Sequence, residues 1–124
     1  MDIKFYRCAH CGQIITFINS KGVPVSCCGE KMQEMLPGTS DGAAEKHVPV
    51  YEVKGNKVIV SVGSVAHPMQ DEHYIEWVIL QAKSGNQRKF LNPGDEPKVS
   101  FDISDGDEVI AVYAYCNLHG LWKA

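Results

Sequence analysis

The sequence predicts a mainly β protein in which a small metal-stapled β module precedes an immunoglobulin-like antiparallel β-sandwich. Four of the five cysteines crowd into the first 28 residues, and so short a segment usually needs a metal, disulfides or a partner chain to fold. From His47 onward, apolar and polar residues alternate with the period of two that is typical of strands. No segment shows a long helical period, which leaves β structure as the prediction for both parts.

The first module begins with two short strands. Residues 3–7 alternate like a strand that leads into the first cysteine pair, and residues 13–18 read as its hairpin partner. Gly12 and Gly29 each follow the second cysteine of a pair, and glycine tolerates the positive φ that a tight ligand loop needs. We expect these turns to aim backbone N–H groups at the cysteine sulfurs.

A linker separates the two modules. Residues 37–42, Pro-Gly-Thr-Ser-Asp-Gly, have the composition of a loop. We therefore predict one domain of residues 1–36 and a second of residues 37–124. Six segments of the second domain are rich in Val, Ile, Tyr and Phe and read as strands, at residues 48–53, 57–62, 74–82, 87–91, 98–103 and 108–115. A sandwich gathers its loops at two ends, so ligands from different loops can converge there.

Composition excludes several classes of protein. The formal net charge of −3 provides no general attraction for nucleic acid. No apolar run approaches the ~20 residues of a membrane span, and residues 1–4 do not begin a signal peptide. An odd number of cysteines argues against a fully paired disulfide scaffold, and clustered cysteines in a reducing compartment more often bind metal. We expect a cytoplasmic protein that binds neither nucleic acid nor membrane.

The first candidate site is a set of four thiolates, Cys8, Cys11, Cys27 and Cys28. Such soft ligands suit tetrahedral iron or zinc. Because two of them are adjacent in the chain, we expect an irregular tetrahedron, and the pattern resembles desulforedoxin, a small protein with one Fe(Cys)4 centre. The residues leave open whether the ion is iron or zinc, and whether its role is structural or redox. His10 is not expected to bind, because four thiolates already fill the tetrahedron.

The second candidate site combines one thiolate with four imidazoles, those of Cys116, His47, His67, His73 and His119. Five ligands are too many for a tetrahedral structural zinc and suit an iron ion with a sixth position open to chemistry. A thiolate opposite that position would push electron density through iron onto a bound oxygen species, as it does in thiolate-ligated haem. On this layout the ligands lie before, between and just beyond the predicted strands.

Four motifs around these residues resemble, in order, the site motifs of superoxide reductases: EKHVPV at 45–50, VAHPM at 65–69, HYIEW at 73–77 and CNLHGLW at 116–122. Together with the desulforedoxin-like N-terminus, they make the whole chain similar to desulfoferrodoxins, the two-iron form with a neelaredoxin-like second domain. No ligand position departs from the pattern. The resemblance implies two iron ions per chain, with zinc as the alternative in the first site.

The resemblance also implies a reaction, the one-electron reduction of superoxide to hydrogen peroxide without release of oxygen. The four histidines would supply equatorial nitrogens and Cys116 the axial sulfur. Lys46 would attract the superoxide anion and help to orient water for protonation, and Glu45 would occupy the sixth position of the resting ferric site. A homodimer, and an external electron donor such as rubredoxin, are implied as well. Such a protein detoxifies superoxide under oxidative stress, and its Fe(Cys)4 centre is accessory.

Two other functions compete with this one. A cupredoxin is also a β-sandwich with a Cys and a His on a late loop, but copper sites of that kind usually add a Met after the final His, and residues 120–124 contain none. A zinc-stapled binding module without turnover is the third interpretation. Metal content separates it from the other two.

Overall fold

The computed structural model describes residues 2–124, which divide between Leu36 and Pro37 into two compact units. Over these residues the regular structure is strand apart from one four-residue helix, α1 (Ala44–His47). Within the same part of the chain, no helix has the length and apolar character needed to cross a membrane. The mainly β fold class is confirmed.

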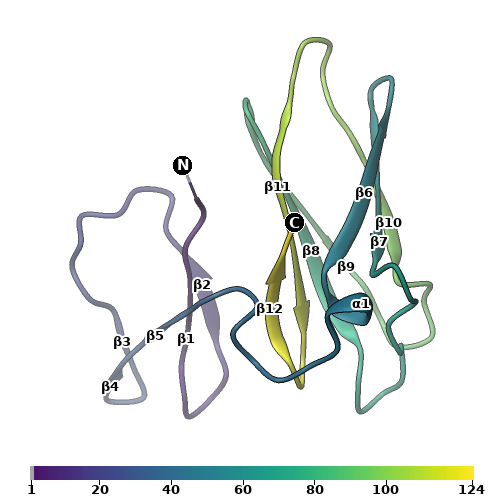
Figure 1. Cartoon of the computed structure of the whole chain (residues 1–124). Helices are drawn as coiled ribbons and strands as arrows, with labels where there is room; N and C mark the ends of the chain where they lie inside the picture. The colour runs from purple at the N-terminus through teal and green to yellow at the C-terminus, as the bar shows by residue number, and fades with distance from the viewer. Residues whose placement is uncertain (1) are drawn as a thin grey trace. The chain divides into compact units, whose positions relative to one another are not determined.

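The first unit contains a small antiparallel sheet and a two-residue hairpin (Figure 1). The sheet has the order β2-β1-β5 and consists of β1 (Phe5–Arg7), β2 (Ile14–Thr16) and β5 (Gln33–Met35). The hairpin consists of β3 (Ser26–Cys27) and β4 (Glu30–Lys31). The β1–β2 hairpin was predicted, although both strands are shorter than expected. The three short strands after it carry no periodic signal and were not predicted.

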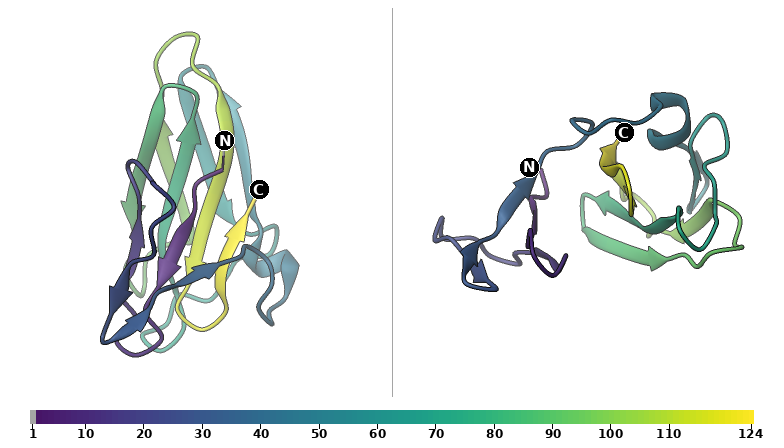
Figure 2. Two further views of the ribbon diagram at one scale, coloured as in Figure 1. Left: turned by 90° about the vertical axis from the view of Figure 1, so that its left-hand side faces the viewer. Right: turned by 90° about the horizontal axis from the view of Figure 1, so that it is seen from below.

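The second unit is a two-layer sandwich whose sheets face each other (Figures 1 and 2). One sheet has the order β10-β7-β6, built from β6 (Pro49–Lys54), β7 (Lys57–Val62) and β10 (Lys98–Asp102). The other has the order β12-β11-β8-β9, built from β8 (Ile75–Ala82), β9 (Gly85–Phe90), β11 (Val109–Cys116) and β12 (Gly120–Lys123). All pairs are antiparallel, and the strand order is that of an immunoglobulin-like sandwich.

Alternate residues of the central strands point into the core between the sheets, as the period of two requires. On β7 the inward positions include Val58, Val60 and Val62, and on β11 they end with Ala114 and Cys116. Cys116 is fully buried within this cluster. The thiol therefore occupies the last inward position of a central strand, where the core of the sandwich meets the loops at its end.

Three features of the second unit differ from expectation. Cys116 was expected just beyond the last strand, but it is the final residue of β11. Residues 120–123 form a further strand, β12, which pairs with β11 and was not predicted because four residues are too few to show alternation. His47 was expected to precede the first strand and does so, but as the last residue of α1. These differences bring the ligands closer to regular structure than the pattern indicated.

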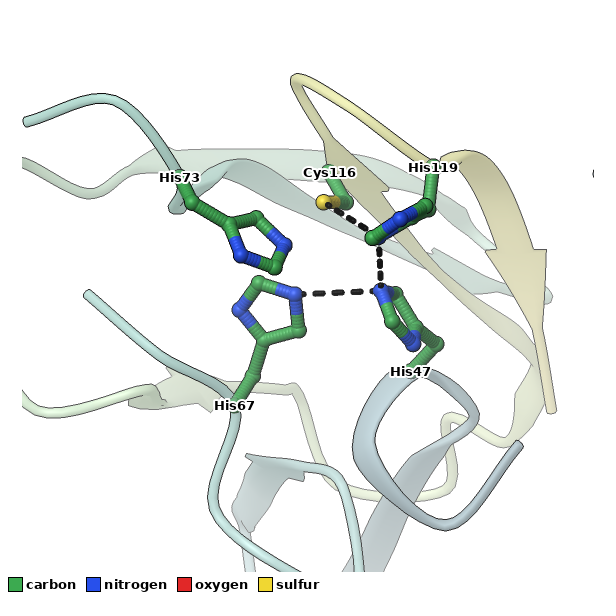
Figure 3. A group of neighbouring side chains, drawn as sticks. All are labelled: His47, His67, His73, Cys116 and His119. Carbon is green, nitrogen blue, oxygen red and sulfur yellow. Dashed lines mark hydrogen bonds between the residues drawn. The ribbon is translucent and has the colours of Figure 1, made fainter. Parts of the chain in front are cut away.

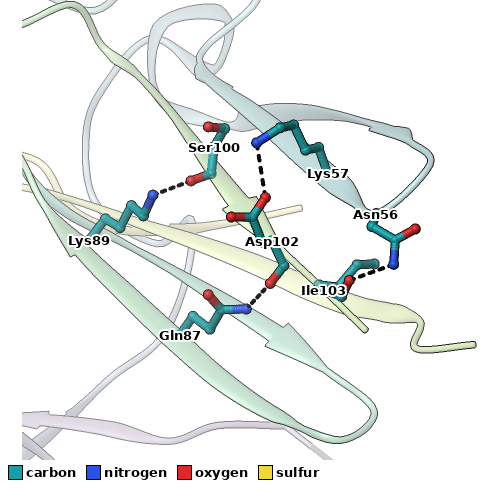
Figure 4. A network of polar contacts seen from close by, with 7 residues as sticks. All are labelled: Asn56, Lys57, Gln87, Lys89, Ser100, Asp102 and Ile103. Carbon is teal, nitrogen blue, oxygen red and sulfur yellow. Dashed lines mark hydrogen bonds and ion pairs between the residues drawn. The ribbon is translucent and has the colours of Figure 1, made fainter. Parts of the chain in front are cut away.

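Polar contacts link β9 and β10, the edge strands of opposite sheets (Figure 4). The side-chain amide of Gln87 donates to the Asp102 carbonyl oxygen at 2.7 Å, and the Lys89 ammonium donates to the carbonyl oxygen of Ser100. Lys57 Nζ pairs with the Asp102 carboxylate at 2.9 Å. Side chains thus cover the backbone carbonyls of an edge strand, which protects it against pairing with other chains.

Candidate metal centres

The structure brings the five predicted ligands of the second site together, with donor atoms that all lie within 4.8 Å of one another (Figure 3). They come from four places in the chain. His47 ends α1, His67 and His73 lie in the connection between β7 and β8, Cys116 ends β11, and His119 lies in the turn before β12. Loops at one end of the sandwich have converged as predicted.

The four imidazole rings form a square. The centroid of His47 lies 4.6 Å from His67 and 4.9 Å from His119, whereas it lies 6.4 Å from His73. His73 in turn lies 4.7 Å from His67 and 5.0 Å from His119. His47 and His73 are therefore diagonal partners, and neighbouring rings stand nearly perpendicular, at 77° to 88°. This arrangement suits four nitrogens that bind one ion from four sides.

Hydrogen bonds decide which nitrogen of each ring faces the centre. His47 Nδ1 lies 2.8 Å from the carbonyl oxygen of Ala43, and His67 Nδ1 lies 2.6 Å from that of Pro68. A carbonyl oxygen can only accept, so each Nδ1 carries the proton and each Nε2 is left with a free lone pair. Histidines that bind metals usually donate their other N–H to a carbonyl in this way, which fixes the tautomer.

The other two rings complete the inward set. His119 is turned the other way, and its Nδ1 lies 3.1 Å from Nε2 of His47. His73 Nε2 is buried without a hydrogen-bond partner among residues 2–124, and a buried polar nitrogen without a partner is costly unless something binds it. The site therefore presents three Nε2 atoms and one Nδ1.

The spacing of these nitrogens fits a single metal ion. His47 Nε2 lies 3.1 Å from His67 Nε2 as well as from His119 Nδ1. Two nitrogens about 2.1 Å from one ion and at right angles to each other would lie about 3.0 Å apart. Two lone pairs facing each other at this distance without a proton or cation between them would repel. The donor set and its distances fit a bound cation.

Burial favours the neutral form of three of the imidazoles, those of His47, His67 and His73. It lowers the pKa of His67 to about 4 and is the main cause of the lowered pKa of both His47 and His73. Hydrogen bonds to backbone carbonyls oppose the shift at His47 and His67, while the positive charge of Lys46 adds to it at His47 and His73. Neutral imidazole is the form that binds metal. These three rings are therefore in their metal-binding form at neutral pH.

The cysteine of this site behaves in the opposite way. Burial raises the pKa of the Cys116 thiol, and the backbone N–H groups of His119 and Leu118 offset this only in part. Its Sγ lies 3.8 Å from Nδ1 of His119. A buried thiol with a raised pKa stays protonated unless a cation takes the place of the proton. Cys116 is thus a thiolate only when the square of imidazoles holds a metal ion.

The loop after β7 fixes the segment that carries Glu45 and Lys46. The backbone N–H of Val65 donates to the Glu45 carbonyl oxygen at 2.8 Å, and Ser64 Oγ donates to the same oxygen at 3.2 Å. A Cβ at Gly63 would lie 2.8 Å from that oxygen, so the close packing requires glycine. Both Glu45 and Lys46 are exposed, on the turn of α1 that ends in His47.

The first site also comes together, with four sulfur atoms within 4.8 Å of one another. Cys11 Sγ lies 3.7 Å from Cys27 Sγ, which lies 4.0 Å from Cys28 Sγ. Sulfurs bound about 2.3 Å from a tetrahedral ion would lie about 3.8 Å apart. The distances fit one ion.

Tight turns form this first site. Gly12 and Gly29 adopt φ values of 79° and 77°, as expected, and Cys28 itself adopts a φ of 53°. The backbone N–H of Cys11 points at Cys8 Sγ from 3.5 Å, which confirms that a turn aims an N–H at a sulfur. His10 lies outside the cluster, where its Nε2 pairs with the Glu30 carboxylate at 3.0 Å.

The thiols of the first site differ in their pKa values. The N–H of Cys11 is the main cause that lowers the pKa of Cys8 to about 6. Hydrogen bonding to Cys8 in turn raises the pKa of Cys27 to about 12, and hydrogen bonding to Cys11 raises that of Cys28. Four thiolates cannot coexist this closely without a cation. This donor set, like the other, is built for a metal.

Comparison with known proteins identifies the family. Residues 39–124 match the sequence profile of the desulfoferrodoxin family. The chain belongs to this family. It is 52% identical over 121 residues to the desulfoferrodoxin of Nitratidesulfovibrio vulgaris, an alignment that covers 98% of this chain and 94% of the relative. The two donor sets correspond to the two iron centres of a desulfoferrodoxin.

Solved structures and shorter relatives agree with this assignment. The crystal structure of the superoxide reductase from Treponema pallidum is 40% identical and superimposes with a TM-score of 0.84, over 100% of this chain and 99% of that one. The superoxide reductase of Pyrococcus horikoshii is 36% identical over 102 residues, which span 68% of this chain and 89% of the relative. The family resemblance noted in the sequence is therefore confirmed.

Sequence reasoning missed the residues that support the ligands. The carbonyl groups of Ala43 and Pro68 accept hydrogen bonds from ligand rings. The lack of a side chain at Gly63 lets the backbone of α1 pack closely there, and the Trp122 ring lies against that of His47. A backbone carbonyl leaves no trace in residue type, so the first two could not be found from sequence. Trp122 stands within a ligand motif and could have been singled out by its position.

Proposed function

We propose that the chain is a superoxide reductase, which reduces superoxide by one electron to hydrogen peroxide at an iron ion held by Cys116 and the four histidines. One observation carries the proposal: a single thiolate lies beside a square of four imidazoles. The names of the Treponema and Pyrococcus relatives support it. A blue-copper site needs two histidines and one cysteine, so four converging imidazoles favour iron over a cupredoxin.

Each residue of the second site has a distinct role in this proposal. Iron in this donor set would supply the transferred electron and an open position for an oxygen anion. Cys116 contributes a buried negative sulfur, which raises the electron density available at that position. Burial favours the neutral form of His47, His67 and His73, so these three ligands add no charge to that of the thiolate. Ala43 and Pro68 hold two of the rings by their carbonyl groups, which limits reorganisation during electron transfer.

Lys46 and Glu45 serve the substrate and the product in this proposal. The charge of Lys46 reaches the site, since it contributes to the lowered pKa of both His47 and His73. A local cation can steer an anion to a protein that carries a formal net charge of −3. Lys46 would also help to orient water that protonates the peroxide, and Glu45 would bind at the open position in the resting oxidised state.

The first unit has an accessory role in this proposal. Its four sulfurs lie close enough together to fill a tetrahedron around one ion, which would leave no position for substrate and suits either a structural staple or an electron store. Iron is proposed there, and zinc is the alternative. The unit folds around its metal, because a segment of this length is rarely stable alone.

External partners complete the proposal. Each turnover consumes one electron, so a donor such as rubredoxin must reduce the iron again. We also propose a homodimer and a cytoplasmic location, in keeping with the family resemblance and with five free thiols, which persist in a reducing compartment.

The experiment that tests the function measures both products. Pulses of superoxide are mixed with the reduced, iron-loaded protein, and peroxide and dioxygen are quantified. We expect one hydrogen peroxide per oxidised iron and no dioxygen from the protein reaction. Release of one dioxygen for every two superoxide anions would identify a dismutase instead. Zinc as the only bound metal, without consumption of superoxide, would support the binding module.

A further inference from the structure

Trp122 touches two of the four histidines without offering a ligand atom itself. Its ring lies 4.9 Å from that of His47 between centroids, at an angle of 32°. Its indole Nε1–H donates to the backbone carbonyl oxygen of His119 at 3.0 Å. The side chain is 5% exposed, so both contacts are shielded from water. One buried residue thus connects ligands that are 72 positions apart in the sequence.

The backbone at Gly42 packs closely against the same three side chains, those of Trp122, His47 and His119. A Cβ at this position would lie 3.1 Å from Cζ2 of Trp122, 3.2 Å from Cε1 of His47 and 3.3 Å from Cβ of His119. Each of these distances is tighter than ordinary van der Waals contact. The next residue, Ala43, accepts the Nδ1–H of His47. Residues 42–43 and Trp122 therefore enclose the His47 ring, which leaves little room for it to move.

The contact of Trp122 on the face of the His47 ring restricts a rotation of that ring that the bonds at its two nitrogens allow. The hydrogen bond at Nδ1 of His47 and a metal bond at Nε2 lie on nearly opposite sides of the ring. Rotation about the line between them changes neither bond length. The contact of Trp122 on the ring face resists this rotation, in addition to the bond that joins the ring to its Cβ. His119 lies in a short turn between β11 and β12, and the bond from Trp122 to its carbonyl oxygen holds that turn.

We propose that Trp122 is a positioning residue that sets the orientation of His47 and His119 around the catalytic metal. The inference rests on the proposed function of this site as an iron centre. Neighbouring equatorial ligands bind the metal through orbitals whose overlap depends on ring orientation. A rotated ring should therefore alter the ligand field, the reduction potential and the rate, while the ligands themselves remain bound.

The test compares Trp122→Phe with Trp77→Phe in the full-length, iron-loaded protein. Phenylalanine keeps an aromatic face at position 122 but removes the N–H donor. Trp77→Phe is the matched control, because it is the same substitution at another tryptophan. The Trp77 ring lies on β8 and stacks on Tyr115, with 5.3 Å between ring centroids, rather than on a ligand. Iron content, the visible and electron paramagnetic resonance spectra of the oxidised site, its reduction potential and the rate with superoxide are measured.

We expect Trp122→Phe to keep its iron, shift the visible band and the potential, broaden the resonance spectrum, and slow the reaction about 10-fold. Trp77→Phe should match the wild type. Wild-type spectra and potential in a folded, iron-loaded Trp122→Phe would overturn the positioning role. Absence of superoxide reduction by the wild-type protein would instead refute the proposed function, and the spectra would still decide whether Trp122 orients the ligands.

A second variant pair covers the case in which Trp122→Phe does not fold. Gly42→Ala places a methyl group against Trp122, His47 and His119, and should produce the same kinds of spectral shift. Gly85→Ala is its control, because nothing lies within 4 Å of a Cβ there. Identical spectra in the two alanine variants would contradict the inference.

Discussion

The two metal-binding units of this chain use opposite designs. In the first, four ligands come from two tight turns of one short segment, and Cys11 and Cys28 are exposed. In the second, the ligands come from four separate places and the sandwich core supports them, with Cys116 and His47 buried. We expect the first unit to depend on its metal for folding, because a segment of this length rarely folds alone. In the second, the sandwich positions the ligands, and the backbone carbonyls of Ala43 and Pro68 select the donor atoms of two rings.

This comparison suggests how structure limits chemistry. In a site made of local turns, the donors lie close together in the chain and can surround the ion on all sides. Four thiolates then fill every position of a tetrahedral ion. A site at the end of a sandwich is approached from loops around one rim, so one side can stay open. We therefore assign the reaction to the second site, which can have an open side, and a structural or accessory role to the first site.

The largest effect that would sharpen the comparison is expected from Cys116→Ser. The variant should lose the sulfur-to-iron charge-transfer colour of the second site and nearly all superoxide reduction, because a serine hydroxyl is a much harder ligand. The colour of the first site should remain. Visible spectra and stopped-flow kinetics check this, and an unchanged second-site spectrum would contradict an axial thiolate.

A smaller effect is expected from Lys46→Ala. Loss of the cation beside His47 should slow the reaction with superoxide about 10-fold at low ionic strength and weaken its dependence on salt. Lys83→Ala is the matched control, since it removes the same charge just beyond the far end of β8. Equal rates and equal salt slopes in the two variants would refute the steering role.

The metal-free second unit should become less stable in acid. Burial lowers the pKa of His67 from 6.5 to about 4, so the folded state binds fewer protons than the unfolded state between these values. Stability is therefore full above pH 6.5 and falls as the pH drops towards 4, by a few kcal/mol at most, since one pKa unit corresponds to about 1.4 kcal/mol.

Tryptophan fluorescence can follow this loss, because both tryptophans, Trp77 and Trp122, lie in the second unit. Urea unfolding of metal-free protein at several pH values gives the slope. His67→Asn should flatten it, and an unchanged slope in that variant would show that another group is responsible.

The smallest effect on activity is expected from Cys11→Ser. This change should disturb the colour and metal content of the first site while most superoxide reduction remains, because the ligands of the second site come from residues 37–124. Complete loss of activity in a folded variant would mean that the first centre is required for turnover. Together with Cys116→Ser it tests whether the two designs are functionally separate.

The sequence predicted regular strands well where alternation was long. Strand β7 has the predicted bounds, Lys57–Val62, because six residues alternate against the core. Strand β12 and helix α1 were missed, since four residues are too few for a period to be recognised. Whether such short elements form depends on their partners, as β12 exists by pairing with β11 across the turn at residues 117–119.

The sequence by itself determined the two donor sets, because cysteine and histidine are identified by residue type and their number limits the geometry. It could not decide which nitrogen of each ring faces the metal, that His47 and His73 are diagonal partners, or that Trp122 supports two ligands. The carbonyl groups of Ala43 and Pro68 are close in sequence to the rings they orient, but their direction depends on the folded backbone, and the ring faces come from segments far apart in the chain. Only the tertiary structure brings these together, because the packing of two sheets decides which loops meet.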